Sequence, residues 1–220
     1  DAGNLFFKKD KISPGITTEI AKISAETIVK CFNKIGCDAY SVGSHDFAAG
    51  VEFVNYLKSL SKFPFLSANI FDKNGQKLFD PYVIVKKGDK KIAFIGLSSV
   101  FKNNDLNIRD PFKTLRGIIE EVENQVDMLI LLFNGTETDL ANLHSKSYPI
   151  DLVIRSRSNL HPPMSKDGGG FNCPVYSLGE RGKYLFEFEI TMNDDSHEFI
   201  DLAYYESKKD RATNYLKNYN

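Results

Sequence analysis

Alternating segments of helical and strand periodicity run through most of the chain. Residues 17–35 place apolar side chains at helical spacing, and Gly36 closes the pattern as a helix C-cap. An apolar, β-prone run at 39–42 follows, and residues 51–60 again show helical spacing. This alternation of helix and strand predicts an α/β fold.

The middle of the chain continues the alternation. It contains a short buried strand at 63–70, a hairpin with strands at 82–85 and 91–97, a helix from Pro111 to about residue 124, an apolar strand at 128–132, a short helix at 138–144 and a strand at 150–154. The apolar run at 128–132 predicts a strand inside a parallel sheet. The lysines at 86–90 predict a solvated hairpin tip, because no aromatic residues are interleaved with them.

The last part of the chain has a different character. Residues 168–170 form a glycine loop without the spacing of a phosphate-binding motif, and residues 175–178, 184–190 and 199–202 predict antiparallel strands. Residues 205–220 are polar and predict a helix or a linker. We therefore expect one domain over residues 1–204, followed by a C-terminal helix or linker over residues 205–220.

Composition narrows the classes of partner. The 220 residues carry 28 basic and 29 acidic side chains, a net charge of −1, which gives no field that would attract nucleic acid or an anionic membrane. No apolar run approaches the roughly 20 residues that span a bilayer, so we expect no transmembrane segment.

The three cysteines, Cys31, Cys37 and Cys173, have neither disulfide-framework nor CxxC spacing, and we expect buried thiols. A Cys31–Cys37 bridge would require the helix to end before Cys37.

Candidate chemistry lies where predicted strands end. Gly43, Ser44, His45 and Asp46 follow the strand at 39–42 and precede a helix. Asn134 follows the strand at 128–132, and the polar run 155–159 follows the strand at 150–154. Because α/β folds bind ligands at the carboxyl ends of their strands, these loops are expected at one rim of the sheet.

The order of these motifs resembles that of the calcineurin-like metallophosphoesterases, in particular their 5'-nucleotidase and UDP-sugar hydrolase branch. The likeness extends over roughly residues 1–190 and is carried by DAGN at 1–4, GSHDF at 43–47, FPFLSANI at 63–70, DP at 110–111, LLFNG at 131–135 with Asp139, IDLVIRSRSN at 150–159, and the segment 174–185. The resemblance implies two mixed β-sheets flanked by helices in an α+β sandwich. It also implies two divalent metals, of the Mn or Zn type, at the rim.

The sequence departs from the family pattern at the implied metal ligands. The five positions are occupied by Asn4, Ser44, Asn134, Arg157 and Asn159. Asparagine offers only a neutral carbonyl oxygen, and Arg157 brings a permanent cation to the place of a dication. His45 is kept, and the resemblance gives it the role of stabilising the transition state or protonating the leaving group. We therefore expect no bound metal.

Two functional readings follow. The first is a degenerate 5'-nucleotidase-like domain that acts as a binding or structural module, in which Arg157, Arg155 and His45 form a pocket for a small anion or a phosphate-containing ligand. In a simpler form of this hypothesis, Arg157 only fills the space that the metals would occupy and pairs with Asp46 or Asp1. The second is an active metal-dependent phosphoester (nucleotide) hydrolase with an atypical metal site, for which His161 and Asp46 are the available additional ligands.

The resemblance carries three further expectations. The first family motif would lie before Asp1, so the sheet would lack its first strand and a partner segment or chain would cover that place. His144 and His197 are expected at the surface, in a helix end and a hairpin. The resemblance also implies a periplasmic or other extracytoplasmic location.

Overall fold

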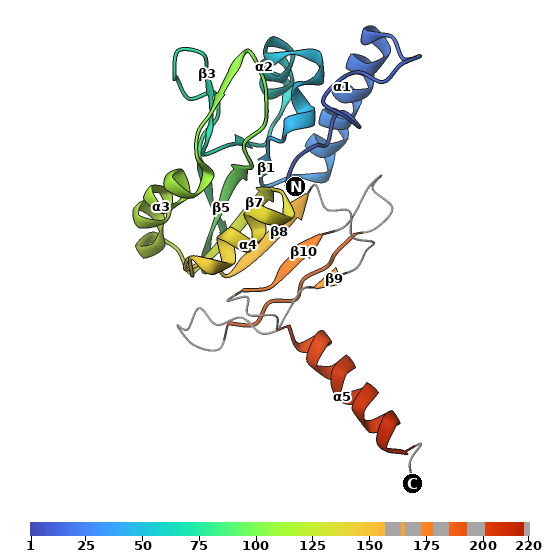
Figure 1. The fold of residues 1–220 in the computed structure, drawn as a ribbon, viewed down its shortest axis with the longest axis vertical. Coiled ribbons are helices and arrows are strands. Elements are labelled where there is room, and N and C mark those ends of the chain that lie inside the picture. Colours follow the sequence, from blue (N-terminus) through green and yellow to red (C-terminus); the bar gives the residue numbers. More distant parts are fainter. Residues whose placement is uncertain (157–163, 166–172, 178–184, 193–200, 218–220) are drawn as a thin grey trace.

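The computed structural model describes residues 1–156, 164–165, 173–177, 185–192 and 201–217 (Figure 1). The helices are α1 (Thr18–Ile35), α2 (Val51–Leu60), α3 (Pro111–Val122), α4 (Glu137–Ser145) and α5 (Leu202–Lys217), with the 3-10 helices η1 (Ser44–Ala49) and η2 (Glu123–Gln125). The strands are β1 (Tyr40–Ser41), β2 (Phe65–Leu66), β3 (Ile70–Asp72), β4 (Tyr82–Lys87), β5 (Lys90–Ser98), β6 (Leu106–Ile108), β7 (Met128–Asn134), β8 (Leu152–Ser156), β9 (Met164–Ser165) and β10 (Val175–Ser177).

The main sheet has the order β4-β5-β7-β8-β10-β9, and its strands β5, β7, β8 and β10 run parallel. All seven residues of β7 are buried because both faces of the sheet are covered. The odd-numbered side chains Leu129, Leu131 and Phe133 pack in one core with the buried faces of α3 and α4. The even-numbered side chains pack in a second core on the opposite face. The sequence prediction for this strand is thus confirmed.

A smaller layer lies against that opposite face. Strands β1 and β2 pair in parallel, and β3 pairs antiparallel with β6. The layers approach closely at Gly96, where a Cβ atom would lie 2.7 Å from the carbonyl oxygen of Leu66. Helices α1 and α2 contribute to an aromatic core around Tyr40, whose ring lies 4.9 Å from that of Phe65. The described residues thus form sheets flanked by helices, as the resemblance implies, but they are one mixed six-stranded sheet and two two-stranded sheets, of which one is parallel and one antiparallel.

The helix boundaries follow from local capping. The Thr17 hydroxyl accepts a hydrogen bond from the Ile20 amide, and Gly36 ends α1 with φ of 83°. The Asp110 carboxylate accepts bonds from two amides of the first turn of α3, which begins with Pro111. The Gly36 cap and the start of α3 at Pro111 lie where the sequence analysis placed them.

The tail differs from its prediction. Strand β10 pairs antiparallel with β9, as predicted for 175–178, but it runs parallel to its other neighbour β8, with Val175 opposite Val153. Residues 185–192 have no regular secondary structure, so the strand predicted at 184–190 is not found in its described part. The rings of Phe186 and Phe188 lie 5.6 and 4.8 Å from that of Tyr176. Residue 202 begins α5 instead of ending a strand. The predicted polar helix is present as α5 and projects from the body of the molecule (Figure 1).

The three cysteine thiols are free. Cys173 is buried and Cys37 is half-buried, but Cys31 is exposed on α1, so the expectation of buried thiols is wrong for Cys31. Helix α1 ends at Ile35, before Cys37. Within the described residues, no helix combines the length and the apolar character that a bilayer span requires.

Candidate functional site at the strand ends

The polar loops predicted to share a rim do so in the structure. Parallel pairing places Asn134, the last residue of β7, beside Ser98 of β5 and Ser156 of β8. Helix η1 follows β1 and carries Ser44 and His45 to the same rim. The prediction that these loops meet at one rim is therefore confirmed for the residues that the structure describes.

Asn134 connects three of these loops through its side chain. Its Nδ2 donates to the Ser156 hydroxyl at 2.7 Å, and that hydroxyl donates to the carbonyl oxygen of Ala2 at 2.5 Å. Its Oδ1 accepts longer hydrogen bonds of 3.5 Å from the Ser44 amide and the Ser98 hydroxyl. Asn134 is fully buried, so its amide group is used for contacts within the protein.

Asn4 lies next to Asn134 across Gly43. The Oδ1 of Asn4 accepts a hydrogen bond of 2.9 Å from the His45 amide. Asn4 adopts φ of 61°, a left-handed conformation that asparagine tolerates better than most residues. A Cβ atom on Gly43 would collide with the side-chain oxygen of Asn4 and lie 2.7 Å from Asn134 Nδ2. Glycine at position 43 thus allows the two amide side chains to meet.

Asp46 anchors η1 to the start of the chain. Its carboxylate is fully buried and accepts three backbone hydrogen bonds, from Gly43 at 2.7 Å, Asn4 at 3.0 Å and Phe6 at 3.2 Å. Burial raises the pKa of this carboxyl above its ordinary value, and the hydrogen bonds oppose that shift. With its oxygens committed to backbone amides, Asp46 acts as a structural anchor. These hydrogen bonds argue against Asp46 as an additional metal ligand, whereas its pairing with Arg157, which lies outside the described residues, stays a prediction.

Ser99 and Asp139 form a second, half-buried contact that the sequence analysis did not identify as a pair. The Ser99 hydroxyl donates to Asp139 Oδ2, which also accepts the Thr136 hydroxyl. The Thr136 amide donates to the Ser99 hydroxyl, and the Asp139 amide donates to the Thr136 hydroxyl. The spacing of Thr136 and Asp139 is that of an acidic capping motif, so Asp139 serves the N-terminus of α4.

Arg155 lies on the other side of the main sheet from Asn134. Its Nε donates to the carbonyl oxygen of Gly135 at 3.0 Å, and its Nη1 pairs with Glu137 at 2.7 Å. Side chains alternate along a strand, so Ser156 faces Asn134 while Arg155 faces α4. The structure therefore does not bring Arg155 to His45, contrary to the expected pocket. Arg157, Asn159, His161 and His197 lie outside the described residues.

The described residues at the rim do not fit a pair of divalent metals. Such ions in a hydrolase require anionic oxygens and neutral imidazoles in a fixed arrangement. Here Asn4, Ser44 and Asn134 supply neutral amides and a hydroxyl, and both amide oxygens already accept hydrogen bonds. In the part of the chain that the structure describes, no cluster of three or more His, Cys, Asp or Glu side chains could hold a metal ion.

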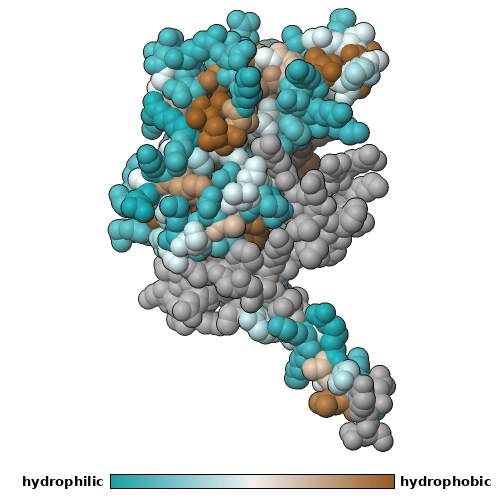
Figure 2. All heavy atoms as spheres, in the orientation of Figure 1, coloured by the Kyte–Doolittle hydropathy of each residue, from teal (hydrophilic) through white to brown (hydrophobic). Residues whose placement is uncertain are grey.

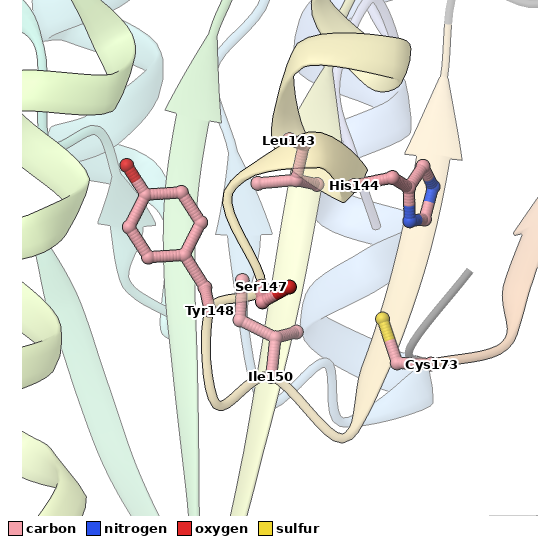
Figure 3. Close-up of a pocket in the computed structure, with 6 residues that line it drawn as sticks. All are labelled: Leu143, His144, Ser147, Tyr148, Ile150 and Cys173. Atoms are coloured by element: carbon pink, nitrogen blue, oxygen red, sulfur yellow. The ribbon is translucent and has the colours of Figure 1, made fainter. Parts of the chain in front are cut away.

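A small cavity lies at the opposite edge of the main sheet (Figure 3). It has a volume of about 10 Å³ and is lined by Leu143, His144, Ser147, Tyr148, Ile150 and Cys173. Ile150 and Cys173 precede strands β8 and β10, so the cavity is at the amino ends of these strands and away from Asn134. His144 is half-buried there, which corrects its expected surface position. Burial raises the pKa of the Cys173 thiol to about 12 and keeps the thiol neutral.

Solved structures with this fold are calcineurin-like phosphoesterases. YfkN from Bacillus subtilis superimposes with a TM-score of 0.66 and 19% identity, covering 80% of this chain and 66% of that one. A putative 5'-nucleotidase from Staphylococcus aureus, solved with alpha-ketoglutarate, gives a TM-score of 0.63 and 17% identity over 80% of this chain and 38% of that one. The chain thus has the calcineurin-like phosphoesterase fold.

Sequence relatives specify the branch, although the chain matches no family profile. Protein UshA of Salmonella pullorum is 36% identical over 172 residues, which are 73% of this chain and 31% of the relative. A 5'-nucleotidase of Vibrio cholerae is 37% identical over 110 residues, 46% of this chain and 20% of the relative. The chain belongs to the 5'-nucleotidase branch of the metallophosphoesterases. The chain spans 31% of the length of UshA and 20% of the length of the Vibrio cholerae 5'-nucleotidase.

Proposed function

We propose that this 5'-nucleotidase-like domain has lost the dinuclear metal centre and acts as a binding or structural module. The observation that carries the proposal is the hydrogen-bond network at the rim. Where the resemblance implies metal ligands, Asn4 and Asn134 direct their amide oxygens at protein donors. The nearby carboxylate of Asp46 holds three backbone amides.

The network also gives the rim a structural role. Asn134, Ser156 and the carbonyl of Ala2 join the ends of two central strands to the start of the chain. Neutral amides and hydroxyls satisfy one another at low cost when buried, whereas a buried unpaired carboxylate would need a cation. Replacement of charged ligands by amides therefore stabilises a rim that works without metal.

The proposal also includes a ligand for the rim and a cellular location for the domain. The rim binds a small anion or a phosphate-containing ligand through Arg157 and His45, without Arg155, which is committed to Gly135 and Glu137. The domain functions outside the cytoplasm, as the resemblance implies. Inorganic phosphate is the probe for the anion: Arg157→Ala should abolish the rise in melting temperature that phosphate gives, and equal protection in the variant would refute the anion pocket.

Metal content and turnover test the proposal directly. The chain is purified, incubated with excess Mn²⁺ or Zn²⁺, desalted and analysed for bound metal, and then assayed with a generic phosphomonoester and a nucleotide. The Vibrio cholerae 5'-nucleotidase, treated identically, is the positive control. We expect less than one metal per chain and no turnover above the background of a His45→Ala variant.

The competing reading, an active hydrolase with an atypical metal site, predicts the opposite result. Metal bound in fixed stoichiometry, with turnover that His45→Ala abolishes, would refute the loss of the centre. Asp10→Ala is a matched control for the substitution, because Asp10 is exposed and away from η1 in sequence. A contaminating phosphatase would leave activity in both variants.

A further inference from the structure

The candidate site at the rim is lined by polar side chains from distant parts of the chain. Figure 2 shows hydrophobic surface over the upper part of the molecule and near the far end of α5. At the rim, Asn4, Ser44 and Asn134 contribute amide and hydroxyl groups, which can both donate and accept hydrogen bonds. The groups that are already bonded within the protein therefore determine what kind of ligand the rim can bind.

The acceptor atoms at the rim are occupied by protein donors. Asn4 Oδ1 accepts the His45 amide at 2.9 Å, and Asn134 Oδ1 accepts two longer hydrogen bonds. The two carboxylate oxygens of Asp46 accept three backbone amides. A divalent cation needs such oxygens as ligands, so the rim offers little to a cation.

Two donors at the rim are not used in this way. In the part of the chain that the structure describes, neither Asn4 Nδ2 nor the Ser44 hydroxyl has a hydrogen-bond partner. The orientation of the Asn4 amide follows from its contact with His45, because only the side-chain oxygen can accept an N–H group. Ser44 is 8% exposed, and a hydroxyl on so deeply buried a residue ordinarily has a partner. Both groups are therefore available to a ligand that accepts hydrogen bonds.

The two donors belong to neighbouring side chains. The Ser44 amide donates to Asn134, and the following amide, of His45, donates to Asn4. A Cβ atom on Gly43 would collide with the side-chain oxygen of Asn4 and lie 2.7 Å from Asn134 Nδ2. The two amide side chains thus meet at the backbone just before Ser44, and one small ligand can contact both donors.

We propose that Asn4 Nδ2 and the Ser44 hydroxyl hold a tetrahedral oxyanion, phosphate or sulfate. This inference rests on the anion pocket of the proposed function and assigns two further contacts to it. The oxygens of an oxyanion accept hydrogen bonds, which matches free donors beside occupied acceptors. The nearby carboxylates of Asp1 and Asp46 oppose an anion, so the guanidinium of Arg157 is required as the balancing charge.

Substitutions of the two donors test the proposal, with sulfate and inorganic phosphate as the probes. Asn4→Asp keeps an oxygen for the His45 amide and replaces the NH₂ group by a second, charged oxygen. It should abolish the rise in melting temperature that either anion gives the unchanged chain. Ser44→Ala removes only the hydroxyl. It should raise the Kd of either anion about tenfold, because a hydrogen bond to a charged group is lost.

Matched controls carry the same changes outside the rim. Asn55→Asp lies on the exposed side of α2, and Ser24→Ala lies on α1, where the hydroxyl bonds to the carbonyl oxygen of Ile20. Both should keep the protection of the unchanged chain. Each variant is also melted without anion, so that protection is measured against its own baseline. If Asn4→Asp does not fold, Ser44→Ala decides alone.

The outcomes separate this inference from the pocket on which it rests. Protection that is lost in Asn4→Asp and weakened in Ser44→Ala, with both controls intact, supports the two contacts. Protection that both variants retain and Arg157→Ala loses would overturn this inference and leave the anion pocket in place. An unchanged chain that neither anion protects would overturn both.

Discussion

Replacing Asp46 by Asn is the sharpest perturbation of the rim. One carboxylate oxygen accepts the amides of Gly43 and Asn4, and the other accepts that of Phe6. Asparagine has a single acceptor oxygen, so in its better orientation one backbone amide faces an NH₂ group. The Phe6 amide and the asparagine NH₂ group that faces it are then both left without an acceptor. Each buried group left unsatisfied costs about 1–3 kcal/mol. Removal of a buried charge offsets part of that cost, and we expect a net loss of about 2 kcal/mol.

Urea unfolding at pH 7, followed by circular dichroism, measures this loss. With a slope of about 2 kcal/mol per molar urea, the midpoint should fall by about 1 M. Asp72→Asn is the matched control: a single oxygen of Asp72 accepts the amides of Asn74 and Gln76, so asparagine can keep both bonds and should change stability by less than about 0.5 kcal/mol. An Asp46→Asn variant as stable as the control would refute the anchoring role.

Two further predictions concern the site glycine and the thiols. Gly43→Ala places a methyl group against the Asn4 side chain and should lower the free energy of unfolding by about 2 kcal/mol. Gly117 is exposed on α3 and a Cβ atom there would have no neighbour within 4 Å, so Gly117→Ala should raise the free energy of unfolding by about 0.5–1 kcal/mol. Equal effects of the two substitutions in urea unfolding would contradict the close approach. Iodoacetamide at pH 8 should alkylate exposed Cys31 first and spare Cys173, whose thiol pKa of about 12 leaves almost no thiolate, and mass spectrometry showing equal labelling would contradict its burial.

Much of the fold is predictable because its signals are local. The helical spacing of α1, its Gly36 cap and the apolar strand β7 are predicted from residues within a few positions of one another. The location of the rim also follows, since parallel strands deliver their carboxyl ends to one edge. The alternation at 185–190 predicted a strand that the structure does not form, because alternation is a local pattern and a strand also requires a neighbouring strand to pair with.

The sequence by itself determined most helices and the central strands of the main sheet, and its likeness to UshA determined the branch of the family. Only the tertiary structure decided what the residues at the rim contact. It turned Arg155 toward Glu137, committed Asp46 to backbone amides and joined Ser156 to Ala2 across 154 positions of the chain. Capping and periodicity depend on neighbours a few residues apart. Hydrogen-bond partners at a buried rim depend instead on which distant segments are packed together and on which side of a strand each side chain emerges.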